Sequence, residues 1–167
     1  MKYPNGLYVA VQFSPESIEK IKSMIDELGV TNPIVPDELH TTVLYSKTPV
    51  GEFDFLTSKQ TPLDRPYTVF PIEFDVFDTE EGNKCLVLLI FSPRLFLMHH
   101  SIKHLTSSEP THPSYRPHIT LSYDCPNADE FKMKDPMDYI NALDIISVSA
   151  NDREDDWADD KTDDSAA

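Results

Sequence analysis

The chain has 167 residues, of which 40% are hydrophobic and 26% are charged, so it fits one globular domain with a substantial core. Its formal charge of −15, with eight acidic residues between Asp152 and Asp164, argues against long RNA or DNA as a partner, because Lys and Arg supply most of the affinity for such polyanions. No apolar run approaches the ~20 residues that a membrane-spanning helix needs, so no membrane partner is expected.

The first residues and the two cysteines indicate the cellular compartment of the protein. Residues 1–6 lack the apolar stretch of a secretory signal. The two cysteines, Cys85 and Cys125, are most simply reduced thiols; the sequence is compatible with a disulfide but does not require one. We therefore expect a cytoplasmic protein.

The first half of the chain predicts a strand, a helix, a loop and a second strand. Residues 7–13 form an alternating or buried strand. Ser14 then supplies an N-cap hydroxyl and Pro15 the first helical position, and the helix presents an apolar face that ends near Gly29. After a proline-bearing loop, residues 40–45 form a short strand.

The second half repeats this order after a connecting segment. A loop rich in Pro, Asp and Thr is expected to run to about Pro66. The elements predicted after it are a long strand over 67–77, a turn over 78–83, a strand over 85–91, a helix that begins at Ser92-Pro93 with the apolar face Leu95, Met98, Ile102 and Leu105, a strand over 118–123, a loop or short helix over 126–138, and a strand over 142–149. The residues beyond Asn151 have too little apolar content to pack alone.

A hidden repeat relates the two halves. When the sequence is compared with itself at an offset of 78 residues, the spacing from His40 to His118, residues 7–46 align without a gap. The identical pairs include Val9 with Val87, Phe13 with Phe91, Ser14 with Ser92, Pro15 with Pro93, Thr42 with Thr120 and Tyr45 with Tyr123. This duplication predicts an α+β fold of two lobes with pseudo-twofold symmetry. Each lobe is expected to have a small sheet with a helix on its outer face, and the two sheets to surround a central cleft.

We expect one two-lobed domain over residues 1–150. One lobe would contain residues 1–66 and the C-terminal strand, and the other residues 67–125. Residues 151–167 would form an acidic tail or a lid.

Each half carries a His-x-Thr triplet at the start of its short strand. Residues i and i+2 of a strand point to the same face, so His40 projects with Thr42, and His118 with Thr120. If the lobes face each other across one cleft, a neutral imidazole can remove the proton of a nucleophilic hydroxyl while a protonated one donates to the leaving oxygen of a phosphodiester. The threonines can bind the non-bridging oxygens. These four residues are the predicted catalytic set.

The histidines also have other interpretations. Each triplet histidine alone is equally well explained as a hydrogen-bonded core or strand-end residue, and a triplet is a short motif that chance can produce; the symmetric placement favours catalysis. A second group, His99, His100, His104 and His112, suggests a metal site, but no Cys or carboxylate completes a ligand set at a recognisable spacing. We predict surface positions for this second group, and no metal or other cofactor.

With these motifs the chain resembles the two-histidine (LigT-like) phosphoesterase superfamily, which is defined by two His-x-Thr/Ser motifs on related lobes. Within it, the chain is similar to the phage anti-CBASS cyclic-oligonucleotide phosphodiesterases. That similarity rests on four strings: Gly6-Leu-Tyr-Val, Leu39-His-Thr-Thr-Val-Leu-Tyr-Ser46, Cys85-Leu-Val-Leu and Pro117-His-Ile-Thr-Leu-Ser-Tyr-Asp124. It covers most of residues 6–124, and the C-terminal quarter matches loosely.

The resemblance implies a metal-independent enzyme that destroys the cyclic di- and trinucleotide alarms of bacterial immunity, such as 3′,3′-cGAMP, in the cytoplasm of the bacterial host. A ribose 2′-hydroxyl would attack the adjacent 3′-5′ phosphodiester and open the ring to a 2′,3′-cyclic phosphate. Water would then yield a linear 3′-phosphate. The resemblance does not assign which histidine acts first, and the oligomeric state is not predicted.

Members of this family also hold the bases of the substrate with aromatic residues and close a C-terminal lid over it. By this resemblance Tyr8 and Phe77 are candidates for base stacking; core packing is an equal interpretation of both, and Phe77 stands where a larger aromatic residue is usual. Glu154 and Trp157 fall where the lid would be, although the spacing departs from the family pattern and disorder is the alternative for Trp157. Arg116, just before the second triplet, is a candidate phosphate contact.

Two other functions fit the same residues. Another enzyme of the superfamily could process a 2′,3′-cyclic phosphate or a 2′-5′ oligoadenylate with the same histidines. A nucleotide-binding sponge without turnover is the non-enzymatic alternative, but sequestration alone needs no pair of proton-transfer groups.

Overall fold

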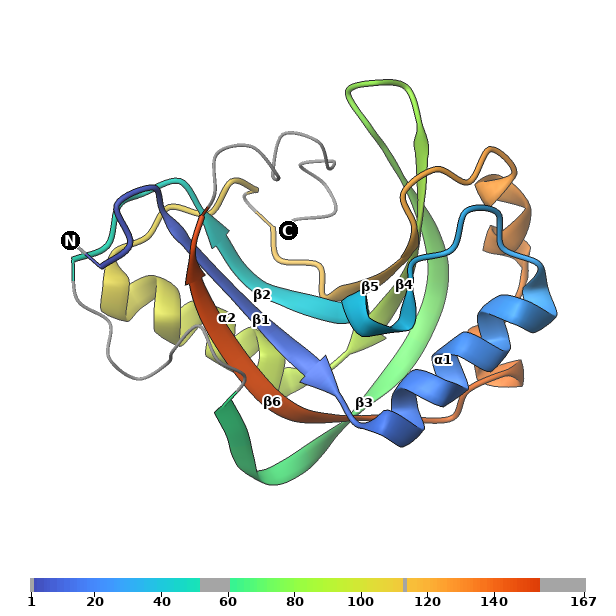
Figure 1. Ribbon diagram of the computed structural model, residues 1–167, viewed down its shortest axis with the longest axis horizontal. Helices are drawn as coiled ribbons and strands as arrows, with labels where there is room; N and C mark the ends of the chain where they lie inside the picture. The colour runs from blue at the N-terminus through green and yellow to red at the C-terminus, as the bar shows by residue number, and fades with distance from the viewer. Residues whose placement is uncertain (1, 52–60, 113, 154–167) are drawn as a thin grey trace.

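The computed structural model describes residues 2–51, 61–112 and 114–153 (Figure 1). Within them, six strands form one antiparallel sheet in the order β2-β1-β6-β3-β4-β5. The strands are β1 (Leu7–Phe13), β2 (His40–Ser46), β3 (Thr61–Asp78), β4 (Lys84–Phe91), β5 (His118–Ser122) and β6 (Leu143–Asp152). The helices are α1 (Pro15–Leu28) and α2 (Pro93–Thr106), with the short 3-10 helices η1 (Pro36–Glu38), η2 (Ala128–Met133) and η3 (Pro136–Asp138).

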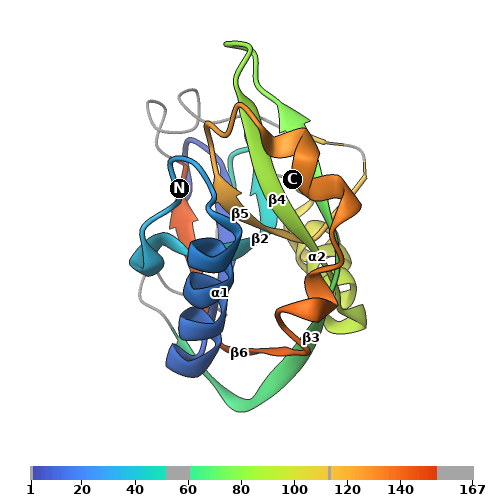
Figure 2. The ribbon, with the colours of Figure 1, turned by 90° about the vertical axis from the view of Figure 1, so that its right-hand side faces the viewer.

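Strand β3 joins the two halves of the sheet. Its first part pairs with β6, beside β1 and β2, and its second part pairs with β4, beside β5. The sheet curves so strongly that its two edge strands approach each other: Cα atoms of β2 and β5 come within 8 Å, although four strands separate them in the sheet order (Figure 1, Figure 2). The predicted α+β fold of two related halves is confirmed.

Both long helices begin as the sequence predicts. The Ser14 hydroxyl accepts a hydrogen bond from the N–H of Ser17 (3.1 Å), and the Ser92 hydroxyl accepts one from the N–H of Leu95 (3.2 Å). A proline follows each cap, at a position whose N–H would have no helical partner. Gly29 ends α1 in the left-handed conformation, with φ 66°. No helix within the described segments is long and apolar enough to cross a membrane.

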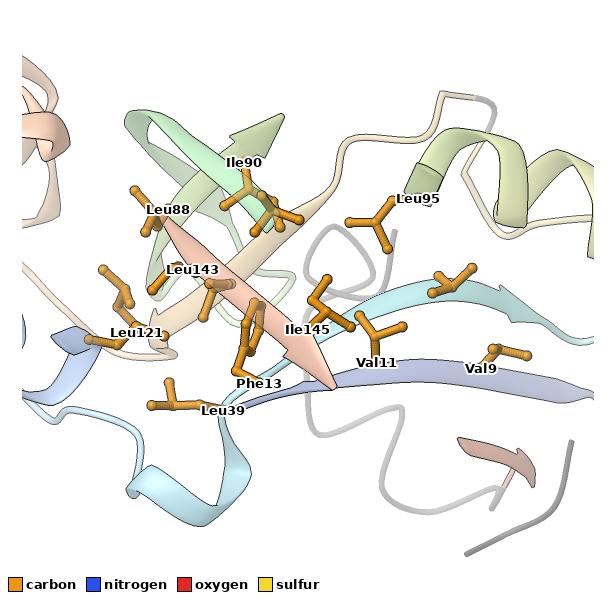
Figure 3. Close-up of a cluster of buried hydrophobic side chains, with 14 of the residues drawn as sticks. Val9, Val11, Phe13, Leu39, Leu88, Ile90, Leu95, Leu121, Leu143 and Ile145 are labelled. Atoms are coloured by element: carbon orange, nitrogen blue, oxygen red, sulfur yellow. The ribbon is translucent and has the colours of Figure 1, made fainter. Parts of the chain in front are cut away.

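The hydrophobic core draws on both halves of the chain (Figure 3). Phe13 of β1 and Ile145 of β6 belong to the same buried cluster as Leu88 of β4 and Leu121 of β5. Each of these four side chains is 2% exposed or less. Burial of such side chains contributes about 1.5–3 kcal/mol each. One large cluster therefore serves both halves, and a smaller cluster of Phe77, Cys85, Val87 and Leu89 lies between β3 and β4 of the second half.

The loops that follow the two long helices are exchanged between the halves. After α1, the N–H of Ile34 donates to the carbonyl of Leu121 in β5 (2.9 Å). After α2, the N–H of Thr111 donates to the carbonyl of Tyr45 in β2 (3.1 Å), and α2 itself lies against β2 (Figure 1). Each half thus covers the exposed edge strand of the other, whose backbone groups need partners. The helices lie outside the sheet as expected, and the structure adds that α2 lies against an edge strand of the other half.

Two strands extend further than expected. β3 begins at Thr61 instead of Tyr67, because Thr61 and Pro62 already pair with β6. The pairing shifts before Tyr67, and this irregular stretch accommodates Pro66, which has no N–H to donate. β6 runs past its expected end to Asp152, which pairs with Leu7 of β1.

The buried face of α2 also differs from the prediction. Leu105 is 64% exposed, and the buried or half-buried positions are instead Leu95, Met98, His99, Ile102, Lys103 and Thr106. His99 was expected at the surface but is 6% exposed, and its Nδ1 lies 2.6 Å from the carbonyl oxygen of Val43. That hydrogen bond makes the burial of an imidazole tolerable. Of the other histidines expected at the surface, His100 and His104 are exposed and His112 is half-buried.

Candidate active site

The two triplet histidines open the two edge strands in the same local arrangement. Nδ1 of His40 lies 2.6 Å from the carbonyl oxygen of Glu38, and Nδ1 of His118 lies 2.7 Å from that of Arg116. A carbonyl oxygen only accepts hydrogen bonds, so we infer that Nδ1 carries the proton in each ring. In a neutral imidazole this leaves the lone pair on Nε2, which is then the atom that can take up a proton.

The first threonine lies on the same face as its histidine. Tyr8 Oη is 2.8 Å from His40 Nε2 and 3.5 Å from Thr42 Oγ1, so one phenol reaches both members of the first triplet. In the second half, Thr120 forms a hydrogen bond with the side chain of Tyr123. Both threonines are buried among the strands, with 5% and 6% of their surface exposed. The i, i+2 geometry of the strand accounts for this placement.

Tyr8 connects the first triplet to β1. It pairs with Tyr45 across β1 and β2, and the two rings meet edge-on with 6.0 Å between their centroids. Burial raises the pKa of Tyr8 to about 12, although the hydrogen bond between its hydroxyl and that of Thr42 acts in the opposite direction. The phenol therefore stays protonated at neutral pH and is a neutral hydrogen-bonding group beside His40.

The second triplet has different neighbours. Phe77 is 6% exposed and meets the His118 ring edge-on, with 5.0 Å between centroids. The Arg116 guanidinium lies 4.9 Å from the centroid of the same phenyl ring and forms an ion pair with Asp75. His118 is thus packed against an aromatic ring, whereas His40 is hydrogen-bonded to a tyrosine.

Electrostatic interactions link Tyr123 in the second half to groups of the first half. Burial is the largest cause that raises the pKa of Tyr123, at the end of β5, and the nearby phenol of Tyr8 raises it further. The carboxylate of Glu38, also from the first half, acts in the same direction. The approach of β2 to β5 brings the two triplets near each other, and the electrostatic influence of Tyr8 and Glu38 on Tyr123 agrees with it. Two imidazoles and two hydroxyls from opposite halves can then act on one substrate.

The structure does not describe two of the expected site residues and shows no metal-ligand group among the residues it does describe. Glu154 and Trp157 lie outside the described residues. Within residues 2–51, 61–112 and 114–153, no three His, Cys, Asp or Glu side chains are grouped so that they could hold a metal ion.

Two residues near the site were missed from the sequence. Asp75 pairs with Arg116, so the cation expected to bind phosphate already contacts a carboxylate. Tyr115 donates its hydroxyl hydrogen bond to the backbone carbonyl of Thr42 (2.8 Å). The repeat gave no signal for Tyr115, because the residue that aligns with it at the offset of 78 is Asp37.

Comparisons with known proteins agree with this fold. The sequence profile of the family described as "Anti-CBASS protein Acb1" matches residues 5–160. The Anti-CBASS protein Acb1 of Salmonella phage S16 is 32% identical over 127 residues, which are 72% of this chain and 74% of the relative. The protein of the same name from Vibrio phage KVP40 is 27% identical over 154 residues, 88% of this chain and 93% of the relative.

Among solved structures, E. coli LigT in its apo form superposes with a TM-score of 0.53 at 19% identity, over 89% of this chain and 87% of that one. LigT complexed with ATP gives a TM-score of 0.51 at 18% identity, over 89% and 86% of the two chains. At this identity the likeness establishes a shared fold.

Proposed function

The chain belongs to the Acb1 family of anti-CBASS proteins, and from that membership and the LigT-like fold we propose that it is a phosphodiesterase that degrades cyclic oligonucleotides. Its substrates are the 3′-5′ linked cyclic di- and trinucleotides of bacterial immune signalling, such as 3′,3′-cGAMP. The relatives are phage proteins, which supports action in the cytoplasm of an infected bacterial cell. Destruction of the signal then prevents the CBASS response.

One observation carries the proposal. Two imidazoles from opposite edge strands each have Nδ1 bonded to a backbone carbonyl, so both exchange protons through Nε2. A reaction that needs one base and one acid suits such a pair, because one ring can hold a proton on Nε2 while the other does not.

In the first step, the 2′-hydroxyl of a ribose attacks the phosphorus of its own 3′-5′ phosphodiester. Nε2 of one histidine, His40 or His118, accepts the hydroxyl proton, and the protonated Nε2 of the other gives a proton to the departing 5′-oxygen. The bond from phosphorus to the 5′-oxygen breaks, and a 2′,3′-cyclic phosphate and a free 5′-hydroxyl form. Thr42 and Thr120 donate hydrogen bonds to the non-bridging oxygens, whose charge grows in the transition state.

In the second step, water takes the place of the nucleophile with the proton roles reversed. The histidine that gave up its proton now accepts one from water, and its partner protonates the 2′-oxygen as that bond breaks. The product is a linear oligonucleotide with a 3′-phosphate, and both histidines return to their starting protonation states. The chemistry requires no metal ion, because the imidazoles and hydroxyls supply proton transfer and charge stabilisation.

Other side chains of the site would contact the substrate. The half-buried Tyr8 lies beside His40 and can stack on a base after its hydroxyl leaves the imidazole. Phe77 exposes too little surface to cover a base fully, so its edge contact also serves to hold His118. Arg116 is half-exposed and can reach a phosphate if it leaves Asp75. Glu154 and Trp157 remain proposed contacts of a C-terminal lid.

Purified protein incubated with a panel of cyclic di- and trinucleotides tests the proposal. We expect 3′,3′-cyclic substrates to give a 2′,3′-cyclic phosphate that later becomes a 3′-phosphate, resolved by chromatography, with equal rates in EDTA. Loss of activity in EDTA that Zn²⁺ or Mg²⁺ restores would contradict the metal-independent mechanism.

The same panel separates the alternatives. Cleavage of a 2′-5′ oligoadenylate or of a 2′,3′-cyclic phosphate alone would assign the chain to a different activity of the two-histidine superfamily. Tight binding of a cyclic dinucleotide that is later recovered intact would make the protein a sponge.

A further inference from the structure

Tyr115 connects the first triplet to the segment that leads into the second. It lies in the segment that leads into β5 and His118, and its hydroxyl donates to the backbone carbonyl of Thr42 in β2 (2.8 Å). We propose that Tyr115 is a positioning residue that sets the spacing between the two His-x-Thr triplets. The inference rests on the proposed function, since it concerns the geometry of that same site.

The sheet alone does not set this spacing tightly. β2 and β5 are the two edges of the sheet, and β1, β6, β3 and β4 lie between them. Each strand pair contributes its own twist, so small variations accumulate from one edge to the other. Acid-base catalysis by groups on both edges tolerates little error, because a misplacement of ~1 Å can cost ~10²-fold in rate. A bond that closes the gap between the edges removes this freedom.

The segment that carries Tyr115 is fixed at its other end. The carbonyl of Arg116 accepts from Nδ1 of His118 (2.7 Å). The carbonyl of Pro117 accepts from the N–H of Ile90 in β4 (3.1 Å). Tyr115 therefore contacts the first triplet, Arg116 the imidazole of His118, and Pro117 strand β4. Residues 115–117 form a short rigid connection between the two half-sites.

Two residues of α2 hold the Tyr115 ring in place. His99 stacks on it, with 4.3 Å between centroids and 3° between the ring planes. Phe96, one helical turn earlier, meets it edge-on at 5.4 Å. A ring held by two neighbours has few alternative rotamers, so its hydroxyl cannot easily leave the Thr42 carbonyl. Burial also raises the pKa of Tyr115, which keeps the hydroxyl protonated as a donor.

The backbone of β2 presents two adjacent acceptors to this pair of rings. Tyr115 donates to the carbonyl of Thr42, and Nδ1 of His99 donates to the carbonyl of Val43 (2.6 Å). Successive carbonyls of a regular strand point to opposite edges. Here the pairing of Val9 with Leu44 and of Ala10 with Thr42 leaves Val43 as an extra residue, and such a bulge re-aims the local backbone. The stacked rings thus secure the irregular part of β2, directly after Thr42.

Tyr115→Phe tests the inference, because it removes the hydroxyl and keeps the ring between Phe96 and His99. We expect kcat per folded molecule on a cleaved cyclic dinucleotide to fall about tenfold or more, with KM changed less than about twofold, since the substrate contacts remain while the reacting groups lose alignment. The folded fraction is measured by near-UV circular dichroism at the assay temperature. Tyr139→Phe is the matched control, since it removes the same group from a half-buried tyrosine of the core in the η3 region, and its kcat should equal that of the wild type.

A fully folded Tyr115→Phe protein with wild-type kcat overturns the inference, as does an equal fall in the Tyr139→Phe control. If Tyr115→Phe does not fold, Phe96→Leu is the second test, because it removes one neighbour of the Tyr115 ring and keeps the Tyr115 hydroxyl. A fall in kcat smaller than tenfold supports the inference, and an unchanged kcat overturns it. Absence of any turnover by the wild-type protein would contradict the proposed function itself, and this inference with it.

Discussion

The two triplet histidines owe their matching proton positions to the backbone. In both, Nδ1 donates to the carbonyl of the residue two positions earlier. Those residues are Glu38 and Arg116, which align in the repeat and have opposite charges. The duplicated feature is therefore a backbone hydrogen bond and not a side-chain type, and in a neutral ring it leaves the lone pair on Nε2.

Removal of either imidazole should abolish turnover. For His40→Ala and for His118→Ala we expect kcat to fall at least ~10²-fold, the contribution typical of a general acid or base, with little change in the thermal midpoint. His104→Ala is the control, because His104 is an exposed histidine of α2. Turnover by either triplet variant at more than about a tenth of the wild-type rate would remove that histidine from the proposed mechanism.

Tyr67 gives a prediction about alkaline stability. It is 6% exposed, its hydroxyl has no hydrogen-bond partner among the described residues, and burial raises its pKa from 10.0 to about 12. A pKa that is higher in the folded state contributes stability below pH 10 and loses it as pH rises toward 12. Between pH 9 and pH 11 the ionisation of Tyr67 should lower the free energy of unfolding by on the order of 1 kcal/mol.

Urea unfolding of Tyr67→Phe tests this at the two pH values. The variant should lose less stability between pH 9 and pH 11 than the wild type, and at pH 7 it should be as stable or more stable, because an unsatisfied buried hydroxyl is gone. Parallel losses in the two proteins would show that Tyr67 does not titrate as its burial indicates.

At the scale of elements, the edge strands depend on segments from the other half of the chain. The loop after α1 bonds to β5, and the loop after α2 bonds to β2. The turn at Gly6 joins the start of β1 to the end of β6. Gly6 has φ +123°, and its carbonyl accepts a hydrogen bond from the N–H of Arg153, just after β6. Misplacement of the loop after α1 or of the loop after α2 therefore affects the edge strand that carries the triplet of the other half.

Gly6→Ala should be strongly destabilising. A Cβ at this position would clash with the carbonyl oxygen of Ser46 at the end of β2, and the φ angle is one that side chains rarely adopt. We expect a loss of at least ~2 kcal/mol in the free energy of unfolding. Gly51→Ala is the matched control, because an added Cβ there meets nothing within 4 Å, and it should change stability by less than about 0.5 kcal/mol. Equal stabilities of the two variants would contradict this account.

At the scale of the whole molecule, the negative net charge of the chain repels the anionic substrate that we propose. The chain has a formal charge of −15, and a cyclic dinucleotide is itself a dianion. The site must therefore gain its affinity from local hydrogen bonds and aromatic contacts and not from a long-range field.

This balance predicts an unusual salt dependence. A rise in ionic strength from about 10 mM to about 150 mM shortens the Debye length from ~30 Å to ~8 Å and screens the repulsion. We expect kcat/KM for a cyclic dinucleotide to increase over this range, which is the opposite of what a basic nucleic-acid-binding protein shows. Steady-state kinetics at matched pH measure it, and a decrease with salt would mean that a positive local field at the site outweighs the net charge.

The sequence by itself determined the features that depend on local patterns of residue spacing. Strand alternation, the serine caps and the repeat gave the order of the elements, and the i, i+2 rule gave the pairing of His40 with Thr42. The duplicated motif also gave the family resemblance, which the comparisons confirm.

Only the tertiary structure decided which residues meet across the sheet. The contacts of Tyr8 with His40 and of Phe77 with His118 depend on strand order and register, and that of Tyr115 with Thr42 depends on how far the sheet curves. The burial of His99 has the same origin, since α2 lies against β2 of the opposite half. Such contacts join residues far apart in the chain, where no local period relates one position to the other, so their partners are set by packing and not by sequence pattern.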